Sequence, residues 1–219
     1  MQKLQEIQGA DILYLMPYII AGLGNPEGTL PNPKENYEET RHNTGRMFVR
    51  WFAEAEELPK FERDKKLKAL ISRGKIGAEK ILAILPDDYM NNSGRSLAPL
   101  VKTKKQARET IVVYDDLDLP FGAFKISFNR GDGGHRGLAS AIKSLKTREF
   151  VRIRIGISPS TPKGRTKKPS GEEKVLKFIL GKYTKEEIAA LKKLSKKVNQ
   201  ALETIIAEGR EKAMGEWNY

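Results

Sequence analysis

Apolar residues recur along the chain in two alternating patterns. Short runs rich in Ile, Val and Leu, bounded by turn residues, predict β-strands at residues 18–22, 67–73, 80–86, 110–116, 123–128 and 151–157. Segments with apolar residues three and four positions apart predict helices at residues 44–58, 91–103, 134–145 and 184–208. This order predicts a single α/β domain, in which helices flank a mixed and mostly parallel central sheet.

Two segments fall outside this alternation. The first 16 residues lack the basic start, the long apolar stretch and the cleavage site of a signal peptide. We therefore interpret residues 1–16 as a weakly ordered N-terminal extension of a domain at 17–219, with Met16 as an alternative start. Residues 158–171 combine three prolines, two glycines and four basic residues, which predicts a loop.

The chain is strongly basic, with 40 Lys and Arg against 28 Asp and Glu and a formal net charge of +12. This charge favours a polyanionic partner such as RNA, although a merely soluble basic surface explains it equally well. A lysine face opposite the apolar stripe of the last helix agrees with RNA contact; its members are Lys192, Lys193, Lys196 and Lys197. The sequence contains no cysteine and no run of membrane-spanning length, which fits a cytoplasmic protein.

Polar residues follow three of the predicted strands. Asn25 and Asn91 come after the first and third strands, and Asp115 closes the fourth. The glycines around Asn25 are spaced one residue too far apart for a dinucleotide-binding loop. A single asparagine here is usually a turn or helix cap, but three polar groups at one sheet edge favour a ligand site.

The chain contains two histidines, His42 and His135. Their wide separation and the absence of cysteine make a metal site a poor interpretation, so a general base is the better one. Asp115 could hold one imidazole nitrogen and leave the other to take a proton from water. No GxSxG motif offers a serine nucleophile. The acidic cluster at 115–118 leaves a magnesium site as a less favoured alternative, because no phosphate loop accompanies it.

Six motifs together resemble one known family. The segments GLGNP, TRHNTG, YMNNSG, DDLDLPFG, GGHRGL and RIRIG stand in the order and approximate spacing of the bacterial-type peptidyl-tRNA hydrolases. The resemblance covers residues 17–209 and implies an α/β domain that hydrolyses the ester between a peptide and the terminal ribose of tRNA. It also implies a monomer that needs neither metal nor cofactor and serves translation and ribosome rescue.

The resemblance assigns roles to individual residues. His42 matches the catalytic base, and Asp115 matches the acid that holds it. Asn25 matches the amide that senses the peptide portion of the substrate. The remaining matches are Asn91, a substrate-binding amide; Met90, which backs the pocket; Tyr37 and Tyr89, beside the tRNA end; and Lys125 and Arg154, contacts to tRNA phosphate.

The sequence departs from the family at several positions. Residues 27–36 enlarge a loop beside the cleft, Ser127 replaces a second phosphate-binding lysine, and Asp132 replaces a usual histidine. Arg136 replaces an asparagine that helps to bind substrate, and we expect its guanidinium to turn outward to a tRNA phosphate. Arg136 is also the main support for the alternative function, a hydrolase-like RNA-binding protein without turnover. The pairing of His42 with Asp115 favours the enzyme.

Overall fold

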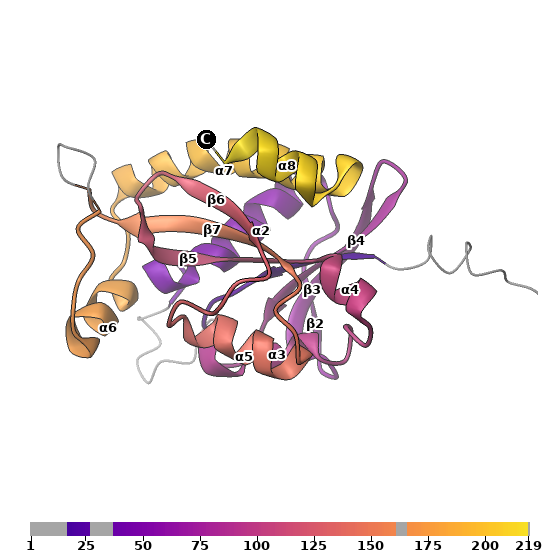
Figure 1. The fold of residues 1–219 in the computed structure, drawn as a ribbon, viewed down its shortest axis with the longest axis horizontal. Coiled ribbons are helices and arrows are strands. Elements are labelled where there is room, and N and C mark those ends of the chain that lie inside the picture. Colours follow the sequence, from indigo (N-terminus) through magenta and orange to yellow (C-terminus); the bar gives the residue numbers. More distant parts are fainter. Residues whose placement is uncertain (1–16, 27–36, 161–165, 219) are drawn as a thin grey trace, which may run out of the picture.

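A sheet of seven strands runs through the centre of the computed structural model, which describes residues 17–26, 37–160 and 166–218 (Figure 1). The order across the sheet is β2-β3-β4-β1-β5-β7-β6. The strands are β1 (Tyr18–Gly22), β2 (Glu62–Asp64), β3 (Ala69–Ile76), β4 (Glu79–Pro86), β5 (Thr110–Pro120), β6 (Phe124–Phe128) and β7 (Val151–Ser158). The four central strands, β4, β1, β5 and β7, are parallel, and the strands beyond them pair antiparallel. The prediction of a mixed sheet is confirmed.

Helices cover both faces of the sheet (Figure 1). One face carries α2 (Thr44–Ala55), α7 (Lys185–Glu208) and α8 (Arg210–Trp217). The other face carries α3 (Gly94–Leu97), α4 (Lys104–Arg108) and α5 (Arg136–Leu145). The helix α6 (Glu172–Leu180) buries no residue in either layer and lies at one end of the molecule.

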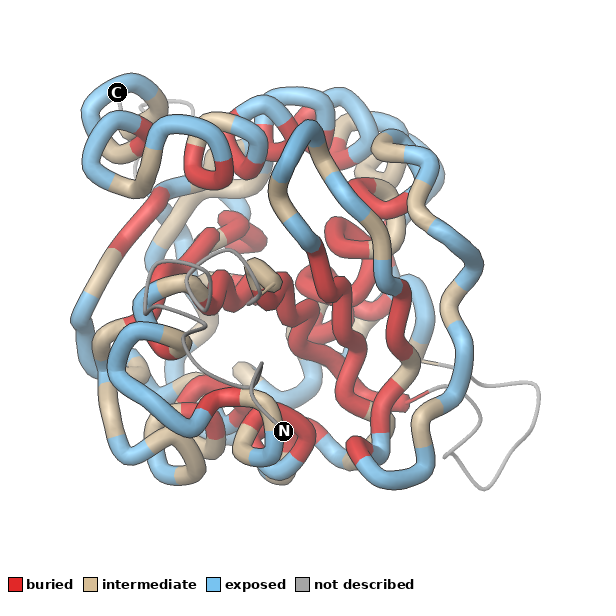
Figure 2. The backbone as a smooth tube through the Cα atoms, turned by 90° about the vertical axis from the view of Figure 1, so that its right-hand side faces the viewer, coloured by how far each residue is buried: buried red, intermediate tan, exposed pale blue. Residues whose placement is uncertain are grey.

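The hydrophobic core consists of two clusters, one on each face of the sheet. Alternation along β1 sends Ile20 into the cluster beneath α2 and α7, and Ile19 and Ala21 into the cluster beneath α3 and α5. A parallel strand covered on both faces is buried, and therefore apolar, at nearly every position. Figure 2 shows the buried positions along the backbone. Each fully buried Ile or Leu contributes about 1.5–3 kcal/mol relative to an exposed one.

The structure corrects the predicted helix at 91–103. The chain instead forms a 3-10 turn, η2 (Met90–Asn92), and then the short α3, and α4 begins separately after Thr103. The helix α3 ends two residues before Pro99, which has no backbone N–H with which to continue the helical hydrogen bonds. Thr103 and Gln106 form a capping box that starts the next one. The short elements β2, α4, α6 and α8 were not predicted.

The connections leaving β1 and β4 open a crevice at the carboxyl edge of the sheet. The chain after β1 leads through a 3-10 turn, η1 (Arg41–Asn43), into α2 on one face, whereas the chain after β4 leads through η2 to α3 on the other. Ligands in α/β sheets bind where neighbouring strands diverge in this way. The predicted extension 1–16 and the enlarged loop 27–36 lie outside the described residues.

Candidate active site

A cleft of about 990 Å³ opens at this edge of the sheet. Residues from η1, η2, β5, β7, α5 and α6 line it, together with the loop that precedes α5. Nine predicted site residues are among them: Asn25, Tyr37, His42, Tyr89, Met90, Asn91, Asp115, Arg136 and Arg154. Lys125 does not line the cleft, but it pairs in register with Arg154 on the neighbouring strand.

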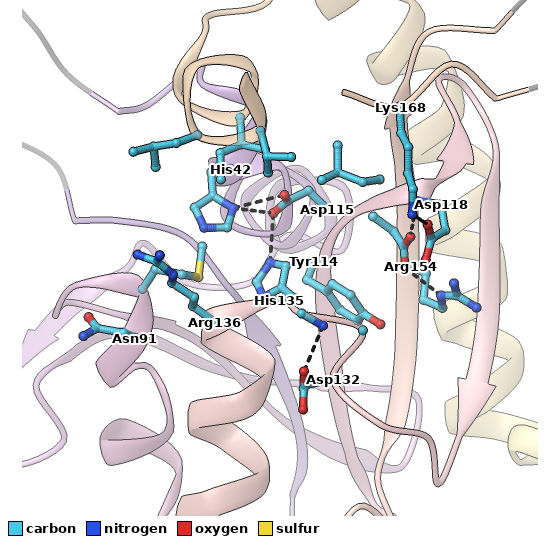
Figure 3. Close-up of a pocket in the computed structure, with 18 of the residues that line it drawn as sticks. His42, Asn91, Tyr114, Asp115, Asp118, Asp132, His135, Arg136, Arg154 and Lys168 are labelled. Carbon is cyan, nitrogen blue, oxygen red and sulfur yellow. Dashed lines mark hydrogen bonds and ion pairs between the residues drawn. The ribbon is translucent and has the colours of Figure 1, made fainter. Parts of the chain in front are cut away.

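His42 and Asp115 meet at the floor of this cleft (Figure 3). The Nδ1 atom of His42 lies 3.2 Å from Oδ1 and 3.0 Å from Oδ2 of Asp115. An ionised carboxylate only accepts hydrogen bonds, so the imidazole carries its proton on Nδ1. Its Nε2 is therefore the nitrogen that can take a proton from a substrate or a water molecule.

The turn that carries His42 is anchored on both sides. Arg41 donates to both carboxylate oxygens of Glu187 on α7, at 3.0 and 3.1 Å. The hydroxyl of Thr44 lies 2.6 Å from the carbonyl oxygen of Arg41 and 2.7 Å from the hydroxyl of Tyr183. These contacts hold the imidazole in place before any ligand arrives, which reduces the cost of ordering it during reaction.

Asp115 is buried, with 3% of its surface exposed. Burial alone raises the pKa of its carboxyl group, because it disfavours the charged form. Attraction to His42 and His135 and the hydrogen bonds with both rings outweigh this and lower the pKa below its ordinary value. Asp115 is therefore a carboxylate at neutral pH, as a partner of a general base must be.

His135 is a site residue that the sequence reasoning did not assign. Its Nε2 lies 3.2 Å from Oδ1 of Asp115, so the carboxylate contacts both histidines of the chain. The residue caps α5, where its Nδ1 accepts the backbone N–H of Leu138 at 3.2 Å. Its position after two glycines, in the first turn of the helix predicted at 134–145, was the available signal, because such a histidine lies at the cleft edge of the sheet.

The three residues His42, Asp115 and His135 are close enough to share a metal ion. Their potential ligand atoms lie within 4.8 Å of one another. However, Nδ1 of His135 accepts a backbone N–H, so the neutral ring carries its proton on Nε2, the atom that a metal would need. The hydrogen bonding of this ring therefore opposes metal binding by the group.

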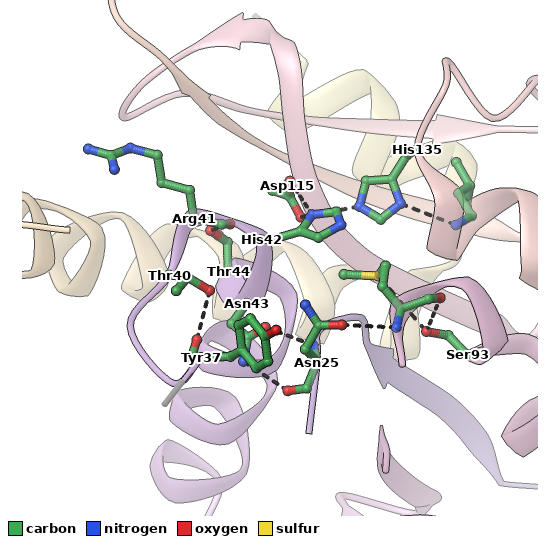
Figure 4. A network of polar contacts seen from close by, with 12 residues as sticks. Asn25, Tyr37, Thr40, Arg41, His42, Asn43, Thr44, Ser93, Asp115 and His135 are labelled. Carbon is green, nitrogen blue, oxygen red and sulfur yellow. Dashed lines mark hydrogen bonds and ion pairs between the residues drawn. The ribbon is translucent and has the colours of Figure 1, made fainter. Parts of the chain in front are cut away.

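Asn25 is held at the cleft by backbone groups (Figure 4). Its Oδ1 accepts the N–H of Met90 at 3.0 Å, and its own backbone exchanges two hydrogen bonds with the side chain of Asn43. Among the described residues, no group accepts a hydrogen bond from the Asn25 amide nitrogen. The geometry leaves this donor for a ligand. Asn43, which the sequence reasoning did not single out, fixes the loop.

Three neighbouring residues extend this wall of the cleft. The Met90 side chain is buried, whereas Tyr89 is 52% exposed at the rim. Asn91 is exposed, and its side chain forms no hydrogen bond with a described residue. The helix cap considered for this residue is absent, since Ser93 precedes α3 without a side-chain cap. Asn91 is thus free to contact a ligand.

Comparison with known proteins agrees with this geometry. The family model described as peptidyl-tRNA hydrolase matches residues 19–219. The peptidyl-tRNA hydrolase of Chloroflexus aggregans is 36% identical over 203 residues, which cover 92% of this chain and 98% of that protein. That of Syntrophotalea carbinolica is 32% identical over 201 residues, with 91% and 96% covered. The chain belongs to the peptidyl-tRNA hydrolase family.

A solved structure of the same family supports the fold. The crystal structure of peptidyl-tRNA hydrolase from Acinetobacter baumannii matches with a TM-score of 0.77 at 29% identity, covering 92% of this chain and 94% of that one. The long central sheet and its helices are therefore shared with a peptidyl-tRNA hydrolase over nearly the whole domain.

Arg136, the main departure from the peptidyl-tRNA hydrolase pattern, contacts an acidic residue on α6. Its Nη2 lies 2.7 Å from Oε1 of Glu172, and the two side chains are 65% and 83% exposed. The guanidinium is thus held at the surface by a residue that was not predicted. Ser127, the second departure, is buried beside Arg152 in the paired strands β6 and β7.

In the acidic cluster within the second half of β5, Asp116 and Asp118 are paired with basic side chains. Asp116 accepts from Nε of Arg154 at 2.8 Å, and Asp118 lies 2.6 Å from Nζ of Lys168. Burial lowers the pKa of Arg154, but the hydrogen bond with Asp116 and the attraction to Asp116 and the neighbouring acidic groups together outweigh this and raise the pKa above its ordinary value. These ion pairs occupy the carboxylates that the magnesium alternative would have used.

Proposed function

We propose that this protein hydrolyses the ester bond between the peptide and the terminal ribose of peptidyl-tRNA. The observation that carries the proposal is the pairing of His42 with the buried Asp115 carboxylate in a cleft of a peptidyl-tRNA hydrolase fold. Binding RNA alone does not require an oriented imidazole with a free nitrogen. Arg136 points to Glu172 rather than into this pair, so no observation favours the non-catalytic alternative.

In the proposed mechanism, His42 acts as the general base. Its Nε2 removes a proton from water while the water oxygen attacks the ester carbonyl, which forms a tetrahedral intermediate. Asp115 stabilises the imidazolium that results, because it is charged and already bonded to Nδ1. The intermediate then collapses, the ester C–O bond breaks, and His42 returns the proton to the ribose oxygen. The products are the free peptide and tRNA.

Two amides and two aromatic rings would position the substrate. Asn25 offers its amide nitrogen to a carbonyl of the peptide, and Asn91 offers a second donor close to the ester. Met90 backs the pocket beneath them. Tyr37 and Tyr89 lie beside the tRNA end, where bases stack favourably on aromatic rings.

Basic residues beside the cleft would bind the tRNA backbone. Lys125 and Arg154 lie in register on β6 and β7, with Lys168 near the same end of the sheet. The lysine face of α7 and the basic loop at 158–171, of which residues 161–165 lie outside the described part of the chain, would add further positive charge. Charge neutralisation of phosphates supplies much of the affinity of such interfaces.

Within the described residues, no helix has both the length and the apolar character needed to cross a membrane. We propose a monomer that acts in the cytoplasm on peptidyl-tRNA during translation and ribosome rescue, and that uses no metal or cofactor. The chemistry assigned to His42 requires neither.

A release assay tests this function. The purified protein is incubated with N-acetylated aminoacyl-tRNA, a minimal peptidyl-tRNA, and the freed amino acid is measured. We expect turnover that falls about a hundredfold to ten-thousandfold in His42→Ala, because a positioned base is lost. Binding of tRNA should persist in this variant. Wild-type turnover in His42→Ala would refute the mechanism, and tRNA binding without any release by the wild-type protein would refute the function.

A further inference from the structure

Each ring nitrogen of His135 contacts a group that can only donate or can only accept a hydrogen bond. The backbone N–H of Leu138 can only donate, so Nδ1 of the ring must accept at this 3.2 Å contact. The neutral ring then carries its single proton on Nε2, which faces Oδ1 of Asp115 at 3.2 Å. The start of helix α5 thus decides which nitrogen of His135 is the donor.

A turn places His135 at this point. Gly133 and Gly134 adopt φ angles of +59° and +80°, which few residues with side chains tolerate. Asp132 holds the turn, since its Oδ1 accepts the N–H of Gly134 at 2.8 Å and its carbonyl oxygen accepts the N–H of His135 at 3.0 Å. The aspartate that departs from the family pattern therefore helps to orient the ring.

The two histidines use different ring nitrogens to donate to Asp115. His42 donates from Nδ1 and keeps Nε2 free, whereas His135 has no nitrogen left for a second task. Their ring centroids lie 5.0 Å apart, at an interplanar angle of 48°. The buried carboxylate is thereby fixed by two N–H donors on separate elements, η1 and the cap of α5.

We propose that His135 is a positioning residue for the hydrolysis proposed above: the α5 cap keeps its proton on Nε2, and this N–H aligns Asp115 on His42. His135 does not act as a second base, because its lone pair on Nδ1 is committed to Leu138. Without this donor, the carboxylate could rotate away from the His42 ring. The imidazole would then lose the orientation that directs its Nε2 into the cleft.

The tautomer can be measured directly on the wild-type protein. Long-range ¹H–¹⁵N spectra of ¹⁵N-histidine-labelled protein at pH 8, where an ordinary imidazole is neutral, distinguish the two nitrogens of each ring. We expect the proton of His135 on Nε2 and that of His42 on Nδ1, with His135→Asn providing the assignment. A His135 proton on Nδ1 would overturn the proposal. This measurement needs no substrate, so its result is independent of the proposed function.

Two substitutions of His135 separate its role as the N-cap of α5 from its role as a hydrogen-bond donor to Asp115. Asparagine is a preferred N-cap residue but is too short to donate to Asp115, so His135→Asn keeps the cap of α5 and removes only the donor. We expect its kcat to fall about tenfold to a hundredfold with KM unchanged, as when a hydrogen bond to a charged group is lost. In His135→Gln the amide nitrogen can occupy the place of Nε2, so we expect kcat to recover while Tm falls.

A cap elsewhere provides the control. Thr103→Ala removes the N-cap of α4 and does not touch the cleft, so it should lower Tm without changing kcat. Wild-type kcat in His135→Asn would overturn the proposal. Equal losses of kcat in His135→Asn and His135→Gln would overturn it too, because the N–H donor would then be irrelevant.

Discussion

Arg136 donates to Glu172, with 2.7 Å between Nη2 and Oε1, and this contact joins the first turn of α5 to the first turn of α6. Both helices border the cleft. The resemblance described in the sequence analysis places an uncharged asparagine at the position of Arg136, and an asparagine could not form this ion pair. An exposed pair of this kind contributes little to stability, about 0.2–1 kcal/mol.

The ion pair leads to a prediction about substrate affinity. Glu172→Gln frees the guanidinium for a tRNA phosphate and should lower KM at moderate salt about one-and-a-half- to fivefold, the factor equivalent to a surface pair. Arg136→Asn should raise KM by a similar factor and keep or raise kcat. Steady-state kinetics on N-acetylated aminoacyl-tRNA measure both.

Glu173→Gln is the matched control, because it removes the same charge from α6 and Glu173 forms no ion pair within the described part of the chain. Equal effects of Glu172→Gln and Glu173→Gln would show that the pairing is irrelevant. If kcat collapses in Arg136→Asn while KM stays constant, the arginine acts at the ester instead.

The register of β6 and β7 predicts two phosphate contacts. Arg154→Gln and Lys125→Gln should each lower the slope of log affinity against log salt by about one unit, because each removes one neutralised phosphate. Binding of tRNA at several salt concentrations measures the slope. Lys75→Gln removes an equal charge from an exposed position of β3, away from the cleft, and should leave the slope unchanged. A slope that all three substitutions alter equally would indicate only a general charge effect.

The lowered pKa of Asp115 predicts a dependence of stability on pH. Its folded-state value lies below the unfolded value of about 3.9, so its contribution is complete above that pH and is lost as pH falls toward the folded pKa. Between pH 5 and 3, the free energy of unfolding should therefore fall more steeply in the wild-type protein than in Asp115→Asn.

The difference in slope is at most about 1.4 kcal/mol per pH unit, the value for one proton. Urea unfolding at a series of pH values measures it. Parallel curves for the two proteins would mean that Asp115 titrates alike in the folded and unfolded states, contrary to its burial between two imidazoles.

Gly45 predicts a link between packing and catalysis. A Cβ atom at this position would lie 2.2 Å from the carbonyl oxygen of Val113 and 2.7 Å from that of Leu23, both backbone atoms that cannot rotate away. Gly45→Ala should therefore cost about 1–3 kcal/mol of stability. It should also lower kcat, because α2 must shift and the neighbouring turn carries His42.

Gly215→Ala on α8 provides the comparison. No atom lies within 4 Å of its hypothetical Cβ, so this substitution should stabilise the protein by about 0.4–1 kcal/mol and leave kcat unchanged. Thermal unfolding and turnover of the two variants test the relationship. Wild-type Tm and kcat in Gly45→Ala would show that α2 is not held at this distance from the sheet.

The local pattern of apolar residues was sufficient to predict the central strands of the sheet and two of the polar residues beside the cleft. The apolar runs predicted β1, β4, β5 and β7 because strands buried on both faces must be apolar. The placement of Asn25 and Asp115 followed from the ends of those strands. The helix predicted at 91–103 was wrong, since the capping residues around Thr103 outweighed its apolar spacing.

Only the tertiary structure decided which distant side chains meet. The order β4-β1-β5-β7 brings Asp115 beside both histidines, and the cap of α5 turns His135 toward it. The contact between Arg136 and Glu172 depends on where α6 lies, and α6 buries no residue that could have marked it in the sequence. Periodicity reports which face of an element is buried. It does not report which elements become neighbours, because this depends on packing between residues far apart in the chain.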